Sequence, residues 1–273
     1  MLPHNPFRLL GKGIAAPSRG HILFGLCFLL VSTAVQSQEI IAHRGYWKID
    51  GSAQNSIDAL MKADSIKAYG SEVDIWLSSD GIPVVNHDAD VTLDGEKLIV
   101  QDTPYATLRK VILANGEPLP TVEEYLNALA RCTHTKLIIE FKPHRTKEQE
   151  DELAAKVVDM VNVKGLTDKV EYISFSLYLV QQTRKITPNA PVYYLNGELP
   201  PKALSTMKAS GPDYHFNVFL NNPTWVKEAH ELGQKVNVWT VNRPEDIQKM
   251  IDMKVDYITT DEPLLVREIL DKQ

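Results

Sequence analysis

The chain has 273 residues, of which 44% are hydrophobic and 23% are charged, and its formal net charge is −6. This composition argues against a disordered, collagen-like or disulfide-scaffold chain and is typical of a globular protein with a sizeable core. An acidic chain also lacks the basic surface that nucleic-acid phosphates require, which argues against a general nucleic-acid binder.

The first 37 residues have the pattern of a secretory signal peptide. Three basic residues and no acid precede an apolar run at 22–35, and small polar residues follow it. The run is too short for a comfortable membrane span, so an uncleaved anchor is the weaker alternative. Cleavage after Ser37 would leave 236 residues with a net charge of −9 and Cys132 as the sole cysteine. We therefore expect an exported protein, periplasmic or secreted, with no stable membrane span after cleavage.

The remainder, residues 38–273, alternates between short β-branched runs and amphipathic stretches. Gaps of 20 to 34 residues separate the starts of the last six runs, which leaves room for one helix per gap. Eight such units predict an α/β fold, a TIM (β/α)8 barrel forming one domain, with an open doubly wound sheet as the alternative. The expected strands are 39–44, 71–76, 136–142, 170–176, 191–196, 213–218, 235–241 and 255–260, and the clearest helices are 150–161, 223–232 and 244–253.

One stretch breaks this rhythm after the second strand. Asp80-Gly81 is a strong hairpin signal, and a two-residue turn there would place Leu77 opposite Val84 and Asp74 opposite His87. The turn-rich sequence that follows predicts a small insertion at about residues 89–119.

Residues that carry chemistry gather at the expected carboxyl ends of the strands, where barrel enzymes place their active sites. Because side chains alternate along a strand, Glu72 and Asp74 share one face, as do Glu140 and Lys142. Three carboxylates converging in a barrel mouth require a compensating cation, and oxygen ligands suit Mg²⁺ or Ca²⁺ better than zinc. Each motif alone is more often structural, so their joint placement carries the prediction.

The motifs HRGYW, SEVDIWLSSDGIPVVNHD, IIEFKPH, VNVWTVN and YITTDEP, in this order, resemble those of the glycerophosphodiester phosphodiesterase family. The resemblance runs from about residue 40 to 263 and implies a TIM barrel that hydrolyses glycerophosphodiesters to an alcohol and glycerol phosphate with one divalent cation. It also implies a role for each of eight residues: general acid and base for His43 and His87, metal ligands for Glu72, Asp74 and Glu140, phosphate contacts for Arg44 and Lys142, and a substrate-pocket wall for Trp239.

One position departs from the family pattern. The chain has Gln54-Asn55-Ser56 where the family usually has Glu-Asn-Thr, so an amide replaces a carboxylate near the site. Two alternatives therefore stand beside hydrolysis of small soluble glycerophosphodiesters. The first is a non-catalytic phosphoester-binding protein, and the second is a related phosphodiesterase acting on lipids or wall polymers.

Overall fold

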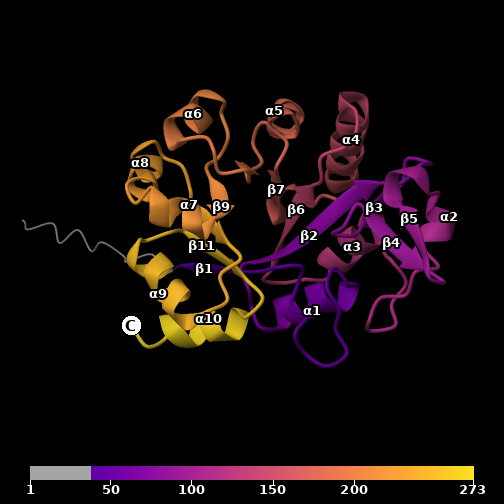
Figure 1. Ribbon diagram of the computed structural model, residues 1–273, viewed down its shortest axis with the longest axis horizontal. Helices are drawn as coiled ribbons and strands as arrows, with labels where there is room; N and C mark the ends of the chain where they lie inside the picture. The colour runs from indigo at the N-terminus through magenta and orange to yellow at the C-terminus, as the bar shows by residue number, and fades with distance from the viewer. Residues whose placement is uncertain (1–37) are drawn as a thin grey trace, which may run out of the picture. The chain divides into compact units, whose positions relative to one another are not determined.

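The computed structural model describes residues 38–273, and the predicted signal peptide at 1–37 lies outside the described residues. Eight parallel strands follow one another in the spatial order β8-β7-β6-β2-β1-β11-β10-β9, with β3 antiparallel to β2 (Figure 1). The strands of this sheet are β1 (Glu39–Ala42), β2 (Gly70–Leu77), β3 (Pro83–Val85), β6 (Lys136–Phe141), β7 (Val170–Ser174), β8 (Val192–Tyr194), β9 (Asp213–His215), β10 (Asn237–Trp239) and β11 (Tyr257–Thr260).

The two end strands of this order, β8 and β9, come together and nearly close the sheet. An isolated parallel bridge joins Tyr194 to Pro212, and Ser210 N–H donates to Val192 O at 2.8 Å. The prediction of a TIM barrel is confirmed, and an open doubly wound sheet is excluded because its edge strands would lie far apart.

Helices follow most of the barrel strands and cover the outside of the barrel (Figure 1). Ser56 caps α1 and Thr121 begins α3 with a full capping box to Glu124, while Pro244 and Pro263 occupy first turns, where a missing N–H costs little. Among residues 38–273, no helix is long and apolar enough to cross a membrane. The helices are α1 (Ile57–Ser65), α2 (Tyr105–Leu108), α3 (Val122–Leu129), α4 (Lys147–Val163), α5 (Leu177–Ile186), α6 (Pro201–Thr206), α7 (Phe216–Asn221), α8 (Trp225–Glu231), α9 (Pro244–Asp252) and α10 (Pro263–Leu270), with short 3₁₀ turns η1 (Val100–Asp102) and η2 (Thr167–Lys169).

The expected strand at 213–218 is wrong in its second half. Strand β9 ends at His215, and α7 begins at the next residue. The His215 ring nitrogen Nδ1 accepts a hydrogen bond from Asn217 N–H at 3.2 Å, which caps the helix. Phe219 is then fully buried and stacks on Tyr214. Tertiary burial of Phe219 therefore outweighs the β propensity of this aromatic segment.

The predicted hairpin register is also wrong, by one residue. Leu77 pairs with Pro83 rather than Val84, and Ile75 pairs with Val85. The turn is one residue longer than a two-residue turn, because Ser78 N–H donates to Ile82 O and Gly81 has a φ of +74°. A turn that ends in a left-handed glycine forms a bulged hairpin, which shifts every later pair.

The segment at about 89–119 forms a small lobe beside β2 and β3, at the right of Figure 1. It contains η1, α2 and an antiparallel hairpin of β4 (Asp90–Leu93) and β5 (Glu96–Ile99). The lobe has an apolar cluster of its own, anchored on the barrel by Trp76 and Val84 and completed by Val91, Val100, Leu108 and Leu119.

The barrel interior is apolar at mid-height and polar at its mouth. Ile41, Ile138, Ile173 and Tyr193 form a cluster inside the sheet, separate from the larger core between sheet and helices. On β6, Glu140 lies two residues beyond Ile138 and so projects above this cluster, and Asp74 on β2 is in register with it. The apolar layer therefore forms a floor on which a polar site is built.

Candidate active site

Three acidic side chains converge at the barrel mouth. Glu72 and Asp74 lie on β2, and Glu140 lies on the adjacent strand β6, in register with Asp74. All three are buried, and one ligand oxygen from each lies within 4.8 Å of the other two. The structure thus brings together the three residues that the sequence predicts as metal ligands.

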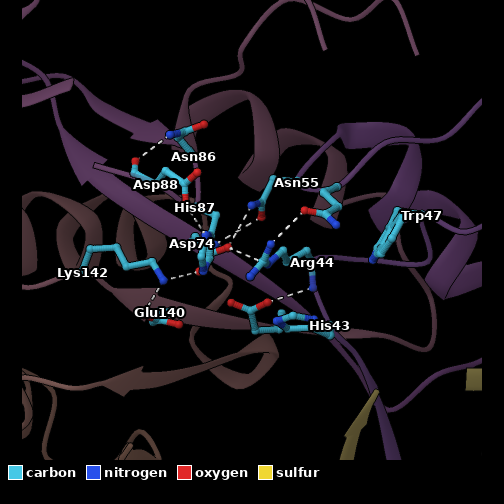
Figure 2. A network of polar contacts seen from close by, with 12 residues as sticks. His43, Arg44, Trp47, Asn55, Asp74, Asn86, His87, Asp88, Glu140 and Lys142 are labelled. Carbon is cyan, nitrogen blue, oxygen red and sulfur yellow. Dashed lines mark hydrogen bonds and ion pairs between the residues drawn. The ribbon is translucent and has the colours of Figure 1, made fainter. Parts of the chain in front are cut away.

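Lys142 provides the nearest compensating charge. Its Nζ lies 2.6 Å from both Asp74 Oδ1 and Glu140 Oε1, and Figure 2 shows the side chain reaching toward these two carboxylates. Asn55 Nδ2 donates to Asp74 Oδ2 at 2.8 Å. Although burial alone would raise it, the Lys142 charge and the Asn55 hydrogen bond lower the pKa of Asp74. Asp74 is therefore the ionised centre of the cluster.

Glu72 and Glu140 are less well compensated. Glu72 Oε2 accepts the Arg44 backbone N–H at 2.8 Å, but Glu72 Oε1 is buried and has no hydrogen-bond partner among residues 38–273. Burial, together with the charges of Asp74 and Glu140, raises the pKa of Glu72 well above its usual range. Burial also raises the pKa of Glu140 to about 7. The neighbouring cations therefore do not fully neutralise the three carboxylates, and a further positive charge would stabilise the cluster.

This donor set fits a hard divalent cation. The cluster offers carboxylate oxygens only, and Lys142 and Arg44 offset two of its three negative charges. Mg²⁺ and Ca²⁺ prefer oxygen ligands, whereas zinc sites usually include histidine or cysteine. The buried and unpartnered Glu72 Oε1 is the oxygen that a cation would satisfy. Glu72, Asp74 and Glu140 are therefore the residues that would hold it.

Arg44 follows β1 in a left-handed turn, with a φ of 55°. The following Gly45 (φ +81°) allows this turn to pack against α1, because a Cβ there would lie 2.5 Å from Ala59 Cβ. Arg44 Nε lies 3.6 Å from Asp74 Oδ2, and its Nη1 donates to Gln54 Oε1 at 2.8 Å. Gln54, the departure noted in the sequence, therefore orients the guanidinium through an uncharged partner.

His43 directly follows β1 and is held by an acidic partner from near the carboxyl terminus of the chain. Its Nδ1 lies 2.8 Å from Asp261 Oδ1, just beyond β11. Asn242 fixes this carboxylate by donating Nδ2–H to Asp261 Oδ2 at 2.8 Å and accepting Asp261 N–H at 2.9 Å. Trp47 Nε1 also donates to Asp261 Oδ1 at 3.3 Å. A proton on Nδ1 leaves Nε2 of His43 as an acceptor.

Sequence reasoning missed the role of Asp261, although it quoted the YITTDEP motif that contains this residue. A signal was available, because Asp261 lies two residues beyond Thr259 and period-two alternation turns both toward the barrel interior. Its contact with His43, 218 residues away, could not be read from the sequence. Parallel pairing of β1 with β11 produces this contact.

His87 lies in the connection from β3 to β4, and its backbone carbonyl accepts the Trp76 indole N–H at 3.3 Å. Its Nδ1 lies 2.6 Å from Asp88 Oδ1. Burial lowers the pKa of His87, and the nearby charges of Lys142 and Arg44 act in the same direction, while Asp74 opposes them. His87 is thus neutral over a wider pH range and, once protonated, is a stronger acid than a free imidazole.

Two hollows meet at these residues. An inner cavity of about 140 Å³ opens into the barrel, and an outer groove of about 910 Å³ runs between the β1–α1 loop and the insertion. Arg44 and His87 line both hollows, whereas His43 lines only the inner one. The inner cavity is also lined by Glu72, Glu140, Lys142, Ile173, Phe175, Leu195, Asp213, Trp239, Thr240 and Thr259.

Trp239 forms one wall of the inner cavity. Its indole Nε1 donates to Asp213 O at 2.9 Å, and its ring packs edge-on against Phe175 with centroids 5.6 Å apart. Seven of the eight residues that the sequence selects therefore line one small cavity, and the eighth, Asp74, lies beside it in contact with Lys142. His144 does not line this cavity; its Nε2 accepts Leu77 N–H at 2.9 Å and braces the end of β2.

The arrangement suits chemistry on a phosphodiester. Arg44 and Lys142 supply positive charge at the junction of the hollows, and two imidazoles flank that junction from different sides. A negatively charged diester could place its phosphate there, with one alcohol moiety in each hollow. Pre-positioned charges and paired acid–base groups are what such a reaction requires.

Comparisons with known proteins agree with this reading. Residues 43–265 match the model of the glycerophosphoryl diester phosphodiesterase family. A glycerophosphodiester phosphodiesterase of Caldanaerobacter subterraneus is 28% identical over 237 residues, covering 82% of this chain and 94% of the relative.

Solved structures give the same result. A crystal structure of a glycerophosphodiester phosphodiesterase from Parabacteroides distasonis superposes with a TM-score of 0.84 at 43% identity, covering 87% of this chain and 98% of the other. A phosphodiesterase from Oleispira antarctica, solved with the product sn-glycerol-3-phosphate, has a TM-score of 0.75 at 24% identity, covering 86% and 97% of the two chains. At that identity the second likeness supports the fold alone.

Cation binding should strengthen as the pH rises. Protonated Glu140 and Glu72 must release protons to bind a cation, and the pKa of Glu140 is raised to about 7. In the cation-free protein, the pKa of Glu140 is higher in the folded than in the unfolded chain, so the free energy of unfolding decreases as the pH rises from the unfolded pKa through about 7. A bound cation removes this loss of stability. We expect the apparent dissociation constant for Mg²⁺ or Ca²⁺ to fall at least about tenfold per pH unit below pH 7.

Thermal unfolding with and without the cation, at about pH 6 and about pH 8, measures this effect as a larger melting-temperature increase at the higher pH. Glu72→Gln and Asp74→Asn should abolish the increase. The variant Glu231→Gln, at the end of α8, serves as the control and should leave it unchanged. A pH-independent increase in the wild type would contradict the assignment.

Proposed function

This chain belongs to the glycerophosphodiester phosphodiesterase family, and we propose that it hydrolyses glycerophosphodiesters to an alcohol and glycerol phosphate with His43 and His87 as its acid–base pair. The observation that carries this proposal is the convergence of both histidines, three carboxylates and two cations on one small cavity. The glycerol phosphate portion would enter the inner cavity, and the second alcohol would lie in the outer groove.

The two histidines divide the proton transfers according to the hollow that each one lines. His43 lines the inner cavity but not the outer groove. Its Nε2 therefore accepts the proton of the nucleophile, and Asp261 stabilises the imidazolium that forms. With water as the nucleophile the products are glycerol phosphate and the alcohol directly. With the glycerol 2-hydroxyl as the nucleophile, the alcohol leaves and a cyclic phosphate forms, which a water molecule then opens to glycerol phosphate. His87 borders the outer groove and donates a proton to the departing alkoxide as its bond to phosphorus breaks.

The basic residues stabilise the negative charge that develops on the phosphoryl oxygens. Arg44 is held in place by Gln54 and Asp74, so its guanidinium needs little reorganisation when the phosphate arrives. Lys142 lies between two carboxylates at the floor of the junction. Glu72, Asp74 and Glu140 would hold one divalent cation, which we propose is Mg²⁺ or Ca²⁺ and which would supply further positive charge to the phosphate oxygens.

Turnover of glycerophosphocholine, glycerophosphoethanolamine and glycerophosphoinositol tests this proposal. We expect release of glycerol phosphate that stops with EDTA and returns with Mg²⁺ or Ca²⁺. His43→Ala and His87→Ala should each lower the rate at least about 10²-fold, the usual scale of acid–base loss. His134→Ala, an exposed histidine outside the site, is the matched control and should retain the wild-type rate.

Three outcomes would contradict parts of this proposal. Full activity after thorough metal removal would overturn the metal assignment. Near-normal rates for either histidine variant would overturn the role of that residue. Binding of glycerophosphodiesters without any turnover would favour the non-catalytic alternative. Turnover of lipid or wall-polymer diesters only would favour the alternative of a related phosphodiesterase for those substrates.

Asp261 acts through His43 as a positioning residue. Asp261→Asn should lower kcat about 10- to 100-fold with little change in KM, because the imidazole loses its orientation and the stabilisation of its protonated form. The acidic limb of the pH–rate profile should move with it, which a purely structural role would not cause. Trp47→Phe, which removes the 3.3 Å contact to the same carboxylate and keeps an aromatic ring in the wall of the outer groove, is the control and should cost less. An unshifted profile in Asp261→Asn would contradict this role.

We also propose that the protein is exported, on the basis of the basic, apolar and small-residue pattern of residues 1–37. Mass spectrometry of the protein recovered from cell envelope and medium should show a mature chain that begins at Gln38. The variant Leu29→Arg, which interrupts the apolar run, should keep the chain uncleaved in the cytoplasm. A full-length chain in the membrane fraction of wild-type cells would instead indicate an uncleaved anchor.

A further inference from the structure

The inner cavity contains one carboxyl group that the chemistry described above does not use. Asp213 is the first residue of β9 and is only 1% exposed, yet it lines the cavity. Its Oδ1 is buried and has no hydrogen-bond partner among residues 38–273. A buried polar atom without a partner is costly, so such an atom beside a ligand cavity indicates a contact that the ligand completes.

The polar neighbours of Asp213 leave its Oδ1 without a hydrogen bond. Asn237 interacts with the Asp213 carboxyl group and opposes the rise of its pKa, but Oδ1 stays unpartnered. Asn237, the register partner of Asp213 on β10, donates Nδ2–H to Thr259 Oγ1 at 2.8 Å and accepts Val238 N–H at 2.9 Å. The backbone carbonyl of Asp213 already accepts the Trp239 indole N–H. Asp213 is therefore part of the cavity wall, and one of its two carboxyl oxygens remains without a hydrogen bond from the protein.

The remaining walls around this carboxyl group are mainly apolar. Ile173, Phe175, Leu195 and Trp239 line the cavity beside it, and they offer carbon surface rather than hydrogen-bonding groups. A cavity of about 150 Å³ holds a molecule the size of benzene, so the 140 Å³ measured here accommodates a three-carbon polyol but no large headgroup. A small chain with C–H groups along its sides and a hydroxyl at its inner end matches this lining.

We propose that Asp213 accepts hydrogen bonds from the glycerol hydroxyls of the substrate and thereby selects phosphodiesters in which one alcohol is a short polyol. This inference rests on the proposed function and deepens it, because it assigns the group that recognises glycerol. A cavity built to bind a hydroxyl rejects an analogue without one, since the buried carboxyl group is then left unpaired. Burial raises the pKa of Asp213 to about 7, and either protonation state accepts a hydrogen bond.

Binding of two ligands to the cation-loaded protein tests the inference independently of turnover. Glycerol 3-phosphate carries the hydroxyls, and n-propyl phosphate is the same three-carbon ester without them. At about pH 8, where most Asp213 carboxyl groups are ionised, calorimetry should show at least about tenfold tighter binding of glycerol 3-phosphate by the wild type. In Asp213→Val, the two affinities should agree within about twofold, while that for n-propyl phosphate stays near the wild-type value.

Asp213→Asn keeps the shape of the side chain and one neutral acceptor, so its preference should be about fivefold smaller than that of the wild type. If the valine variant does not fold, this variant decides, and an unchanged preference overturns the inference. The matched control is Thr183→Val. Thr183 on α5 also has a buried hydroxyl without a partner, but it lies in the helical layer and does not line the cavity. Its loss should leave the preference intact.

The outcomes separate this inference from the function on which it rests. Equal binding of both ligands by the wild type, or an undiminished preference in Asp213→Val, overturns hydroxyl recognition by Asp213 but not phosphodiester hydrolysis. A parallel loss of affinity for both ligands in the variants assigns Asp213 to packing alone and also overturns it. Binding of neither ligand by the wild type overturns the proposed function, and the inference falls with it.

Discussion

Burial of three carboxylates at the barrel mouth is the constraint on which the rest of the site depends. Like charges in a poorly solvated place repel and lose hydration, so each needs a partner. Asp74 takes Lys142 and Asn55, Glu140 shares Lys142, and Glu72 receives only one backbone N–H. The negative charge that these partners leave uncompensated favours binding of a cation. The ion pairs and hydrogen bonds of the cluster also hold the surrounding side chains in fixed positions.

The fixed arrangement of these charged side chains also explains how an acidic chain can bind an anionic substrate. The acids are clustered with Lys142 among them, and Arg44, His43 and His87 line the same cavity. Arg44 projects from a tight turn that depends on Gly45 packing against α1, and its neutral partner Gln54 leaves the guanidinium charge available. The local field at the junction is therefore set by a few pre-positioned groups rather than by the net charge of the protein.

Sequence patterns were least reliable where tertiary packing or exact turn length decides the outcome. The strand expected through 218 ends at His215, because burial of Phe219 favours a helix in that position. The hairpin after β2 is offset by one residue, because Gly81 adopts a left-handed conformation and adds a bulge that the Asp-Gly pair alone does not reveal. His87 still lines the cavity, because it lies in the connection between β3 and β4, outside the paired residues whose register is shifted.

The sequence by itself determined the barrel, through the spacing of its strands, and the shared faces of Glu72 with Asp74 and of Glu140 with Lys142, through period-two alternation. Both are local properties of a chain whose strands lie parallel. Only the tertiary structure decided which side chains from distant strands meet. Closure places β11 beside β1, which brings Asp261 to His43, and it makes Asp213 part of the wall of a cavity that no single strand forms. Such contacts depend on the register and curvature of the closed sheet, and these are fixed by the packing of the whole barrel.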